Sequence, residues 1–464
     1  MLAAIANTFS NCFKIPELKS RILFTMLLLA VCRLAAYIHC PGLDGSALAA
    51  FFREAAKKQD PSGGILGLYS MFTGGALENC AIGALGIMPY ISATIIIQLM
   101  TAVVPQLSKL AREEGGRTKL IQYGRYLTVI LCLGQGFVMA LGWENPQKVF
   151  GEAFRGSLLY DESWIWWYRI QTTLVLTTGT MLLMWLGEQI TERGIGNGVS
   201  LVITIGILAR LPAAGLALKD MFWPGGGMEA KFHLFGTGTV LVALMALVIA
   251  GIIAVTQAQR KIPVQYAQRA VGRKVYSGGT SFMPLRVNYA GVMPIIFAQA
   301  ILMFPQKIFL FLGSTFNVKF FAEIARALNE GAVLYMTLYG LMILFFSYFW
   351  VATQFNELQI ADDLKKNGGY IPGVRPGQAT SDYLHNAMHR ITLAGAVFLT
   401  IIAIIPIIMT REMQIPYQVG SFFGGTSMLI TVGVMLDTMR QTESHLLMRH
   451  YDGFLKKGRL RGRF

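Results

Sequence analysis

The chain has 464 residues, of which 54% are hydrophobic and 14% charged, and its mean hydropathy is +0.51. Soluble domains carry about 25% charged residues, so this composition excludes an ordinary soluble domain and predicts a membrane protein with several helical spans. The net charge of +15 would suit a nucleic-acid partner, but the basic residues lie between apolar runs, where membrane topology explains most of them.

Apolar runs long enough for a membrane helix, roughly 20 residues, follow one another along the whole chain. The first comes after Lys14, Lys19 and Arg21 and lacks a small-residue cleavage site, so we interpret it as a retained span and not as a signal peptide. We therefore predict an all-α polytopic membrane protein with ten transmembrane helices, near 22–39, 81–103, 125–142, 166–186, 198–211, 234–255, 289–311, 332–354, 391–409 and 419–437.

The basic segments predict the orientation of these spans. With ten spans both termini lie on one side of the membrane, together with the loops 105–122 and 257–288 and the tail 438–464. These three segments are rich in Lys and Arg, whereas the opposite loop 143–165 has four acidic and two basic residues. The positive-inside rule then places both termini in the cytoplasm.

Two of the apolar runs contain nearly the same interruption. The run 84–99 has Gly-Ile-Met-Pro at 86–89 and follows the Gly-rich stretch 63–75, and the run 289–298 has Gly-Val-Met-Pro at 291–294, 205 positions later. Proline bends a helix, and irregular backbone at membrane depth is tolerated only where protein or a water-filled cavity covers it. Each run alone fits an ordinary kinked packing helix. Corresponding interrupted spans in two halves indicate internal repeats, so we expect one kinked helix from each half beside a central path.

The expected halves are 1–210, with spans one to five, and 234–437, with spans six to ten. Between them lies 211–233, which contains proline and glycine and which we expect to be an external hinge loop. The long cytoplasmic loops 257–288 and 355–388 fit either solvated positive-inside loops or a docking surface. In 257–288, six basic residues without an acid favour docking of ribosomal RNA or of an acidic protein face.

Residues typical of catalysis, metal binding or ion coupling are scarce. The five cysteines lack metal-ligand spacing, the six histidines do not cluster, and no nucleophile–base set is present, so we predict neither an enzyme nor a cofactor. Glycines in 187–198 superficially suggest a phosphate loop, but no strand precedes them and no P-loop lysine follows, which favours a tight turn.

The alternative function is a secondary transporter of a small solute, which is also built from repeats with broken helices. From residue 234 onward, however, the cores of the predicted spans carry no Asp, Glu, Lys or Arg, whereas ion-coupled transporters usually place such residues there. Arg33 and Arg169 are the nearest exceptions, and either side chain fits snorkelling to an interface.

Four motifs, in this order, resemble those of the SecY family, the channel subunits of the bacterial protein translocase. They are GIMPYISA at 86–93, WLGEQITERGIGNG at 185–198, IPGVRPG at 371–377 and FGGTS at 423–427. The resemblance runs almost end to end. It implies ten spans in two pseudo-symmetric inverted halves around a central pore, hinged outside between spans five and six.

The resemblance also implies a function and a set of site residues. Unfolded secretory polypeptides cross the plasma membrane through the pore, and membrane-protein segments leave sideways into lipid between spans two and three and spans seven and eight. The implied residues are Ile87, Ile91, Val199, Ile203, Ile296 and Ile430 for a pore ring, Ile65, Leu66, Leu68, Met71 and Phe72 for a plug within 63–75, and Gln98 and Asn288 for the lateral gate. The i,i+4 spacing of 87/91 and of 199/203 puts each pair on one helix face, although plain packing fits these residues too.

The partners are implied in the same way. Arg375 and the basic pair Arg273 and Lys274 match positions that contact the motor ATPase SecA or the ribosome. SecE-like and SecG-like small membrane subunits, substrates with signal sequences and membrane lipid complete the expected set. One departure is Thr256-Gln257, where the bacterial pattern often has Glu-Arg, so an opposite-charge pair is missing at the base of the docking loop.

Overall fold

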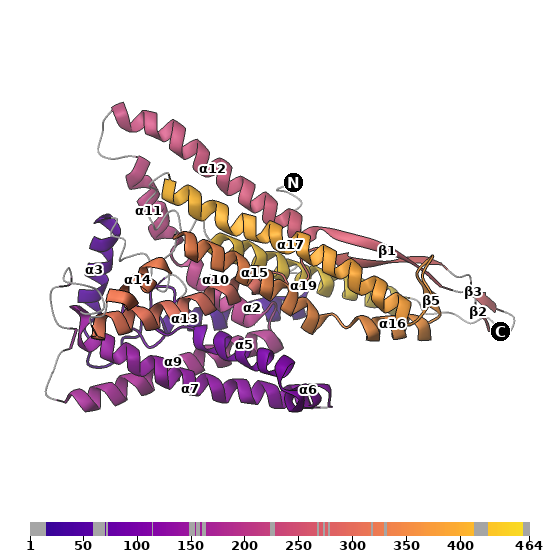
Figure 1. Cartoon of the computed structure of the whole chain (residues 1–464), viewed down its shortest axis with the longest axis horizontal. Coiled ribbons are helices and arrows are strands. Elements are labelled where there is room, and N and C mark those ends of the chain that lie inside the picture. Colours follow the sequence, from indigo (N-terminus) through magenta and orange to yellow (C-terminus); the bar gives the residue numbers. More distant parts are fainter. Residues whose placement is uncertain are drawn as a thin grey trace.

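The computed structural model describes most of the chain, and of the predicted spans only the last, 419–437, lies partly outside the described residues. The described residues are 15–58, 70, 73–113, 115–147, 154, 158–159, 164–222, 228–266, 269–271, 274–276, 279–316, 319–328, 332–412 and 426–457. Figure 1 shows the long helices running roughly along the longest axis of the molecule, with α3 and α14 at one end and the β-strands at the other.

Helices account for nearly all of the regular structure. In the first half they are α2 Pro16–Leu34, α3 Gly45–Lys58, α5 Met88–Val103, α6 Pro105–Arg112, α7 Gly116–Glu144, α9 Ile165–Arg193, α10 Gly198–Leu208 and α11 Leu211–Phe222. In the second half they are α12 Met228–Gln257, α13 Met293–Phe316, α14 Lys319–Ala327, α15 Val333–Gln354, α16 Glu357–Lys366, α17 Gln378–Glu412 and α19 Thr426–Lys457.

The helices have the length and composition of membrane spans. Among the described residues, five helices are long and apolar enough to cross a bilayer, and the bent pair α5 and α6 adds a sixth candidate. Shorter apolar helices cover Val242–Gln257 and Met293–Leu302. Each of the ten predicted spans overlaps a described helix, which confirms a helical multi-span protein and is consistent with the count of ten.

Several threonines inside the spans donate from their hydroxyls to carbonyls of the preceding turn. In α9, Thr173 donates to the carbonyl of Arg169 at 2.7 Å and Thr177 donates to that of Thr173 at 2.8 Å. This back-bonding satisfies a polar group that would otherwise be costly in an apolar environment. Helix α9 is continuous over 29 residues, although Thr172 Oγ1 and Thr180 Oγ1 are buried without a hydrogen-bond partner.

The two matching motifs have matching backbone conformations. Gly86 and Gly291 both adopt the left-handed region, with φ of 61° and 64°, which glycine enters at no steric cost. The helices α5 and α13 then begin at the methionine two positions later, with Pro89 and Pro294 in their first turns. Proline is well tolerated there because the first N–H groups of a helix lack intrahelical partners.

Two details of the predicted interrupted spans are therefore wrong. Pro89 and Pro294 begin their helices and do not kink them, and the proline inside α13 is Pro305. In the predicted span 81–103, residues before Met88 form turns and the helix covers only the rest.

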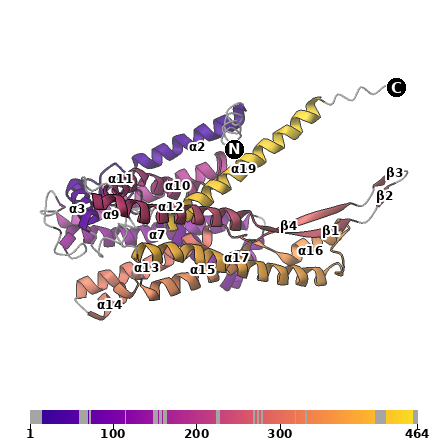
Figure 2. The ribbon, with the colours of Figure 1, turned by 90° about the horizontal axis from the view of Figure 1, so that it is seen from above.

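Each half has its own packed helices, and the halves meet along a central seam. In the first half α7 packs on α9 and α5 packs on α7, and in the second half α15 packs on α17 and α13 packs on α15. The seam is formed where α5 contacts α13, where α10 contacts α19, and where α13 contacts α19. Figure 2 shows the same lengthwise arrangement from above, with α14 and the strands again at opposite ends.

Short strands occupy the two predicted docking loops, so the all-α description holds for the spans and not for these loops. The strands are β1 Gln259–Tyr266, β2 Arg269–Val271, β3 Lys274–Tyr276, β4 Thr280–Arg286 and β5 Gly369–Tyr370. They form an antiparallel sheet of order β4-β1-β5 and a small β2-β3 pair. Ile262 and Leu285 are buried on one face, because alternate strand residues face the same side.

The predicted hinge loop and the basic tail are both largely helical in the described residues. The hinge loop 211–233 contains α11 and the start of α12, separated by residues outside the described set. Leucine and alanine dominate α11, and both favour helix. The basic tail 438–464 continues α19 without a break as far as Lys457, because no proline interrupts it and leucine, methionine, glutamine, glutamate and lysine also favour helix.

Candidate pore and docking sites

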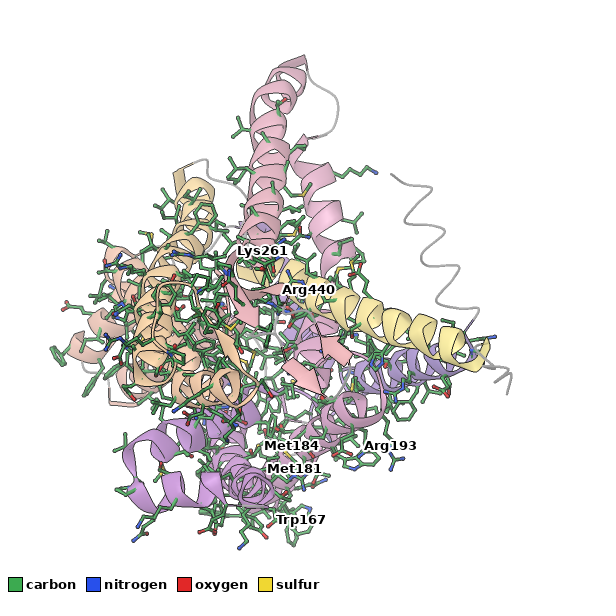
Figure 3. All side chains as sticks on the ribbon, turned by 90° about the vertical axis from the view of Figure 1, so that its right-hand side faces the viewer. Trp167, Met181, Met184, Arg193, Lys261 and Arg440 are labelled. Carbon is green, nitrogen blue, oxygen red and sulfur yellow. The ribbon has the colours of Figure 1, made fainter. Side chains whose placement is uncertain are left out.

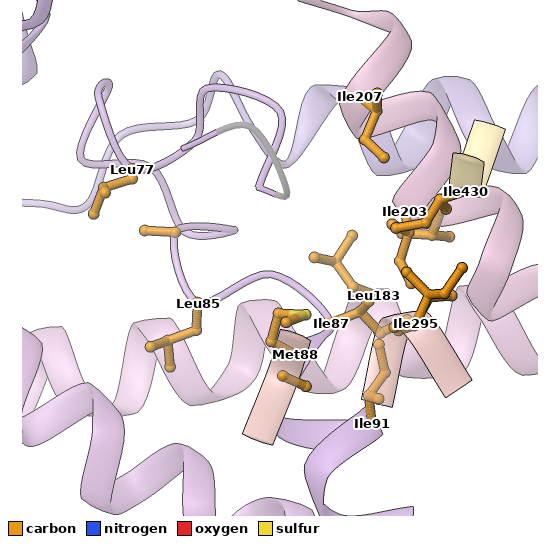
Figure 4. Packing of buried hydrophobic residues seen from close by; sticks show 14 of the residues in the cluster. Leu77, Leu85, Ile87, Met88, Ile91, Leu183, Ile203, Ile207, Ile295 and Ile430 are labelled. Atoms are coloured by element: carbon orange, nitrogen blue, oxygen red, sulfur yellow. The ribbon is translucent and has the colours of Figure 1, made fainter. Parts of the chain in front are cut away.

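The six residues of the predicted pore ring lie in one apolar cluster drawn from four helices. Ile87 and Ile91 come from the start of α5, Val199 and Ile203 from α10, Ile296 from α13 and Ile430 from α19. All but Val199 are at most 4% exposed, and Val199 packs against the same cluster. Figure 4 shows Ile87 and Ile91 from the start of α5 converging with Ile203 of α10 and Ile430 of α19.

Glycines bring the elements of the ring close together. A Cβ on Gly187 of α9 would lie 3.6 Å from Ile87 Cδ1 and 3.5 Å from the backbone nitrogen of Val199. A Cβ on Gly198 would overlap the carbonyl of Gly187. The start of α10 can therefore press against α9, and Ile87 fills the adjacent space. The side chain of Asn197 caps α10 by accepting from Ser200 N at 3.2 Å. The tight turn predicted at 187–198 is shorter than expected, because residues 187–193 still belong to α9 and only 194–197 connect it to α10.

Three further residues belong to the same group but were missed from sequence. Leu183 of α9, Ile207 of α10 and Ile295 of α13 lie beside the ring in Figure 4, and each is at most 6% exposed. Ile207 continues the i,i+4 series of 199 and 203, so helical spacing alone would have found it. Leu183 carries no such signal, because α9 is apolar around most of its circumference.

Polar side chains with unmet hydrogen bonds border the ring along the seam. Within the described residues, Gln98 Oε1, both polar atoms of the Gln299 side chain, and Thr431 Oγ1 are buried without a hydrogen-bond partner. An unsatisfied buried polar group costs about 1–3 kcal/mol. These groups sit on α5, α13 and α19, the helices through which the halves meet.

The predicted gate residues occupy this region in different ways. Gln98 is half-buried in α5. Asn288 is buried just before α13, and its side-chain nitrogen donates to the carbonyl of Gly291 at 3.0 Å. Asn288 thus braces the left-handed turn that starts α13, a local role that the sequence alone did not indicate.

All five predicted plug residues, Ile65, Leu66, Leu68, Met71 and Phe72, lie outside the described residues. The described neighbours are Ser70 and the segment from Thr73 onward, and both Ser70 and Thr73 are buried. This segment contacts the ends of α2 and α10 through charged side chains that the sequence analysis did not connect.

The two predicted docking loops form one unit. Strand β1 of the first loop pairs with β5 of the second, with Gln265 opposite Tyr370, and the Tyr370 hydroxyl donates to Gln265 Oε1 at 2.9 Å. Below them, a second apolar cluster joins Ile262 and Leu285 to residues of α15 and α17. A ligand that binds either loop therefore contacts a surface continuous with the other.

Arg375 is presented by a tight turn at the edge of this unit. The side chain is exposed, and its backbone carbonyl accepts from Thr380 Oγ1 at 2.9 Å. Gly373 and Gly377 on either side adopt φ of 82° and 105°, and buried Ile371 anchors the turn to the second cluster. Of the basic pair, Arg273 lies outside the described residues, and Lys274 begins β3, where the structure describes its backbone only.

The base of the docking unit is held by the last helix. Arg440 of α19 donates from Nη2 to the carbonyl of Thr256 at 2.6 Å, at the C-terminal end of α12 and shortly before β1. Arg440 is labelled in Figure 3, which views the molecule from the strand end. Position 256 thus makes a backbone contact that does not need the opposite-charge pair of the bacterial pattern.

Arg33 and Arg169, the two arginines singled out from the sequence, are bound to protein groups. Arg169 pairs with Glu144 at 2.9 Å, and its guanidinium lies 4.9 Å from the ring centre of Trp166. Arg33 donates to the carbonyl of Gly74 at 3.0 Å. The two arginines are therefore held by protein groups, and snorkelling to an interface is not needed to explain their positions.

Comparison with known proteins gives consistent matches. A family model described as SecY matches residues 81–439. Proteins named "Protein translocase subunit SecY" from Chlamydia trachomatis and from Escherichia coli K12 are 42% and 40% identical, covering 98% and 96% of this chain and 99% and 96% of their own lengths.

Solved structures share the fold at lower identity. One described as a protein-conducting channel has a TM-score of 0.59 at 16% identity, and covers 95% of this chain and 94% of its own. Sec61 in a canine ribosome–channel complex from the endoplasmic reticulum has a TM-score of 0.55 at 15% identity, with the same coverage.

Proposed function

This chain belongs to the SecY family, and we propose that it is a protein-conducting channel whose path lies along the seam between its halves. The observation that carries the proposal is the ring: isoleucines from α5 and α10 of one half, and from α13 and α19 of the other, meet in one buried group. Unfolded secretory polypeptides pass through this point.

The ring suits a path that must pass polypeptide but hold back ions. Isoleucine offers no group that can replace the hydration shell of an ion, so a narrow ring of isoleucines excludes water and ions at rest. Its side chains make non-directional contacts and can separate around a passing chain without selecting one sequence. A plug within 63–75 covers the ring on its outer side.

The same seam can release apolar segments into lipid. The unmet polar groups of Gln98 and Gln299 lower the cost of separating α5 from α13, because water or a passing backbone can then supply the missing hydrogen bonds. Gln98 and Asn288 border this lateral gate. Membrane-protein segments with sufficient hydrophobicity leave through it.

The docking unit faces the cytoplasm, and its partners are the motor ATPase and the ribosome. Exposed Arg375 and the basic strands of 257–288 supply positive charge, which suits an acidic protein face or ribosomal RNA. SecE-like and SecG-like subunits complete the channel in the plasma membrane, and both termini are cytoplasmic. The canine relative, described in a ribosome–channel complex, supports the ribosome as a partner.

A reconstitution experiment tests the function directly. The chain is co-purified with its small subunits, placed in lipid vesicles, and supplied with motor ATPase, ATP and a secretory precursor. We expect precursor to become protease-protected in an ATP-dependent manner. Vesicles that instead take up a small solute along an ion gradient, and protect no precursor, contradict the proposal.

A further inference from the structure

Glu78 and Arg210 form an ion pair that joins the segment after the predicted plug to the end of α10. Arg210 Nη2 lies 2.5 Å from Glu78 Oε1, and the two side chains are only 22% and 19% exposed. Fully buried Ser70 donates to the same carboxylate at 2.7 Å and accepts a hydrogen bond from Arg210. Ser70 and Glu78, eight residues apart, thus both contact Arg210, whose Nε is buried without a hydrogen-bond partner.

Arg33 of α2 holds the same segment by donating to the carbonyl of Gly74. Gly74 has φ of 63°, and a Cβ there would overlap Arg33 and lie 2.9 Å from Gly206 Cα of α10. Gly75 has φ of 90°, and a Cβ there would lie 3.4 Å from Arg210 Nη2. The two glycines thus allow the backbone to pass close to both α2 and α10, where both arginines reach it.

We propose that Ser70, Glu78, Arg33 and Arg210, named here the clasp, are positioning residues that hold the root of the plug in the resting channel. The clasp contacts the chain at Ser70, before Met71 and Phe72, and at Gly74 and Glu78, after them. It therefore holds the backbone on both sides of the last predicted plug residues. The inference rests on the proposed function, because it assumes that 63–75 acts as a plug.

The chemistry of the clasp suits a reversible hold. Charged groups with little exposure are stable only when they are paired or hydrated. At rest Glu78 and Arg210 pair with each other. When the plug moves, entering water hydrates both groups, so release costs a limited amount of free energy and the closed state remains preferred. A purely apolar contact at this place would have no hydrated state of this kind to replace it.

The chain contains a matched control ion pair. Arg169 and Glu144 are 2.9 Å apart and 20% and 14% exposed, so their burial is close to that of the clasp. They join α7 to α9, which pack along their length within one half. Loss of this pair should affect stability without affecting the plug.

The test measures current across planar bilayers that contain the purified complex without motor or substrate. Glu78→Gln keeps the shape of the side chain but removes its charge, and we expect roughly a tenfold rise in resting current, the size that loss of a charge-assisted hydrogen bond typically gives. Glu144→Gln should leave the current unchanged. The exchange Glu78→Arg with Arg210→Glu should return the current toward that of the parent chain.

A second readout separates positioning from general weakening. With motor and ATP, Glu78→Gln should transport a precursor with a defective signal sequence at least several-fold faster than the parent chain, while Glu144→Gln should not. Equal currents and equal selectivity for the parent chain and Glu78→Gln, in a complex that transports a normal precursor, overturn the clasp. A parent complex that transports nothing overturns the proposed function instead.

Discussion

Replacing Ile296 by serine should make the resting channel leak ions. Ile296 is 2% exposed within the ring, and burial of such a side chain contributes about 1.5–3 kcal/mol. A loss of about 2 kcal/mol from the closed state corresponds to roughly a thirtyfold shift in the wetted population, at 1.4 kcal/mol for each factor of ten. The hydroxyl also gives water a hydrogen-bond partner that isoleucine lacks.

The assay is resting current across planar bilayers, compared among three complexes. The parent chain should be tight, Ile296→Ser should conduct, and the triple variant of Ile87, Ile91 and Ile296 to serine should conduct more. The control replaces Ile96, Ile130 and Ile401, which are 38%, 65% and 48% exposed, by serine and should stay tight. If the ring variants are as tight as the parent chain while the complex still transports precursor, these residues do not form the seal.

Three further changes test other parts of the account. Arg375→Glu should abolish motor-driven transport of a precursor while leaving membrane insertion of the chain intact, because it sets like charge against its partner; normal transport in vesicles would refute that role. Arg440→Ala should remove a charge-assisted bond to Thr256 and lower the thermal midpoint of the complex by a few degrees, with faster hydrogen exchange at the start of β1. Gly198→Ala should force α10 away from Gly187 and lower both stability and transport, and an unchanged melting curve would contradict that packing.

The repeated motif shows what sequence could establish about the fold. A shared Gly-x-Met-Pro pattern, 205 positions apart, predicted two corresponding places, and both have left-handed glycines followed by a new helix. The backbone conformation at these prolines was predicted wrongly, because proline can either kink a helix from within or occupy its first turn. Only the preceding Gly86 and Gly291 distinguish them, and their φ values are not written in the residue types.

The docking unit and the clasp show why other parts of the structure could not be predicted from the sequence. Alternation of Ile262 and Val264 is a strand signal, but it is short and contains Pro263, which weakens a strand assignment. The pairing of β1 with β5 joins loops far apart in the chain, and so does the pairing of Glu78 with Arg210. Such contacts depend on how the spans pack. The sequence also does not distinguish a charged residue that snorkels to the interface at a span end from one that forms an ion pair.

Cross-linking from the channel to a stalled precursor tests most directly whether polypeptide passes through the isoleucine ring. A photoreactive amino acid is placed at Ile91, Ile203 or Ile430 in separate variants, and at exposed Ile130 as control, and a precursor is halted midway by a folded domain at its end. We predict adducts between the precursor and all three ring positions and none at Ile130. Adducts at Ile130 with none in the ring would contradict the claim.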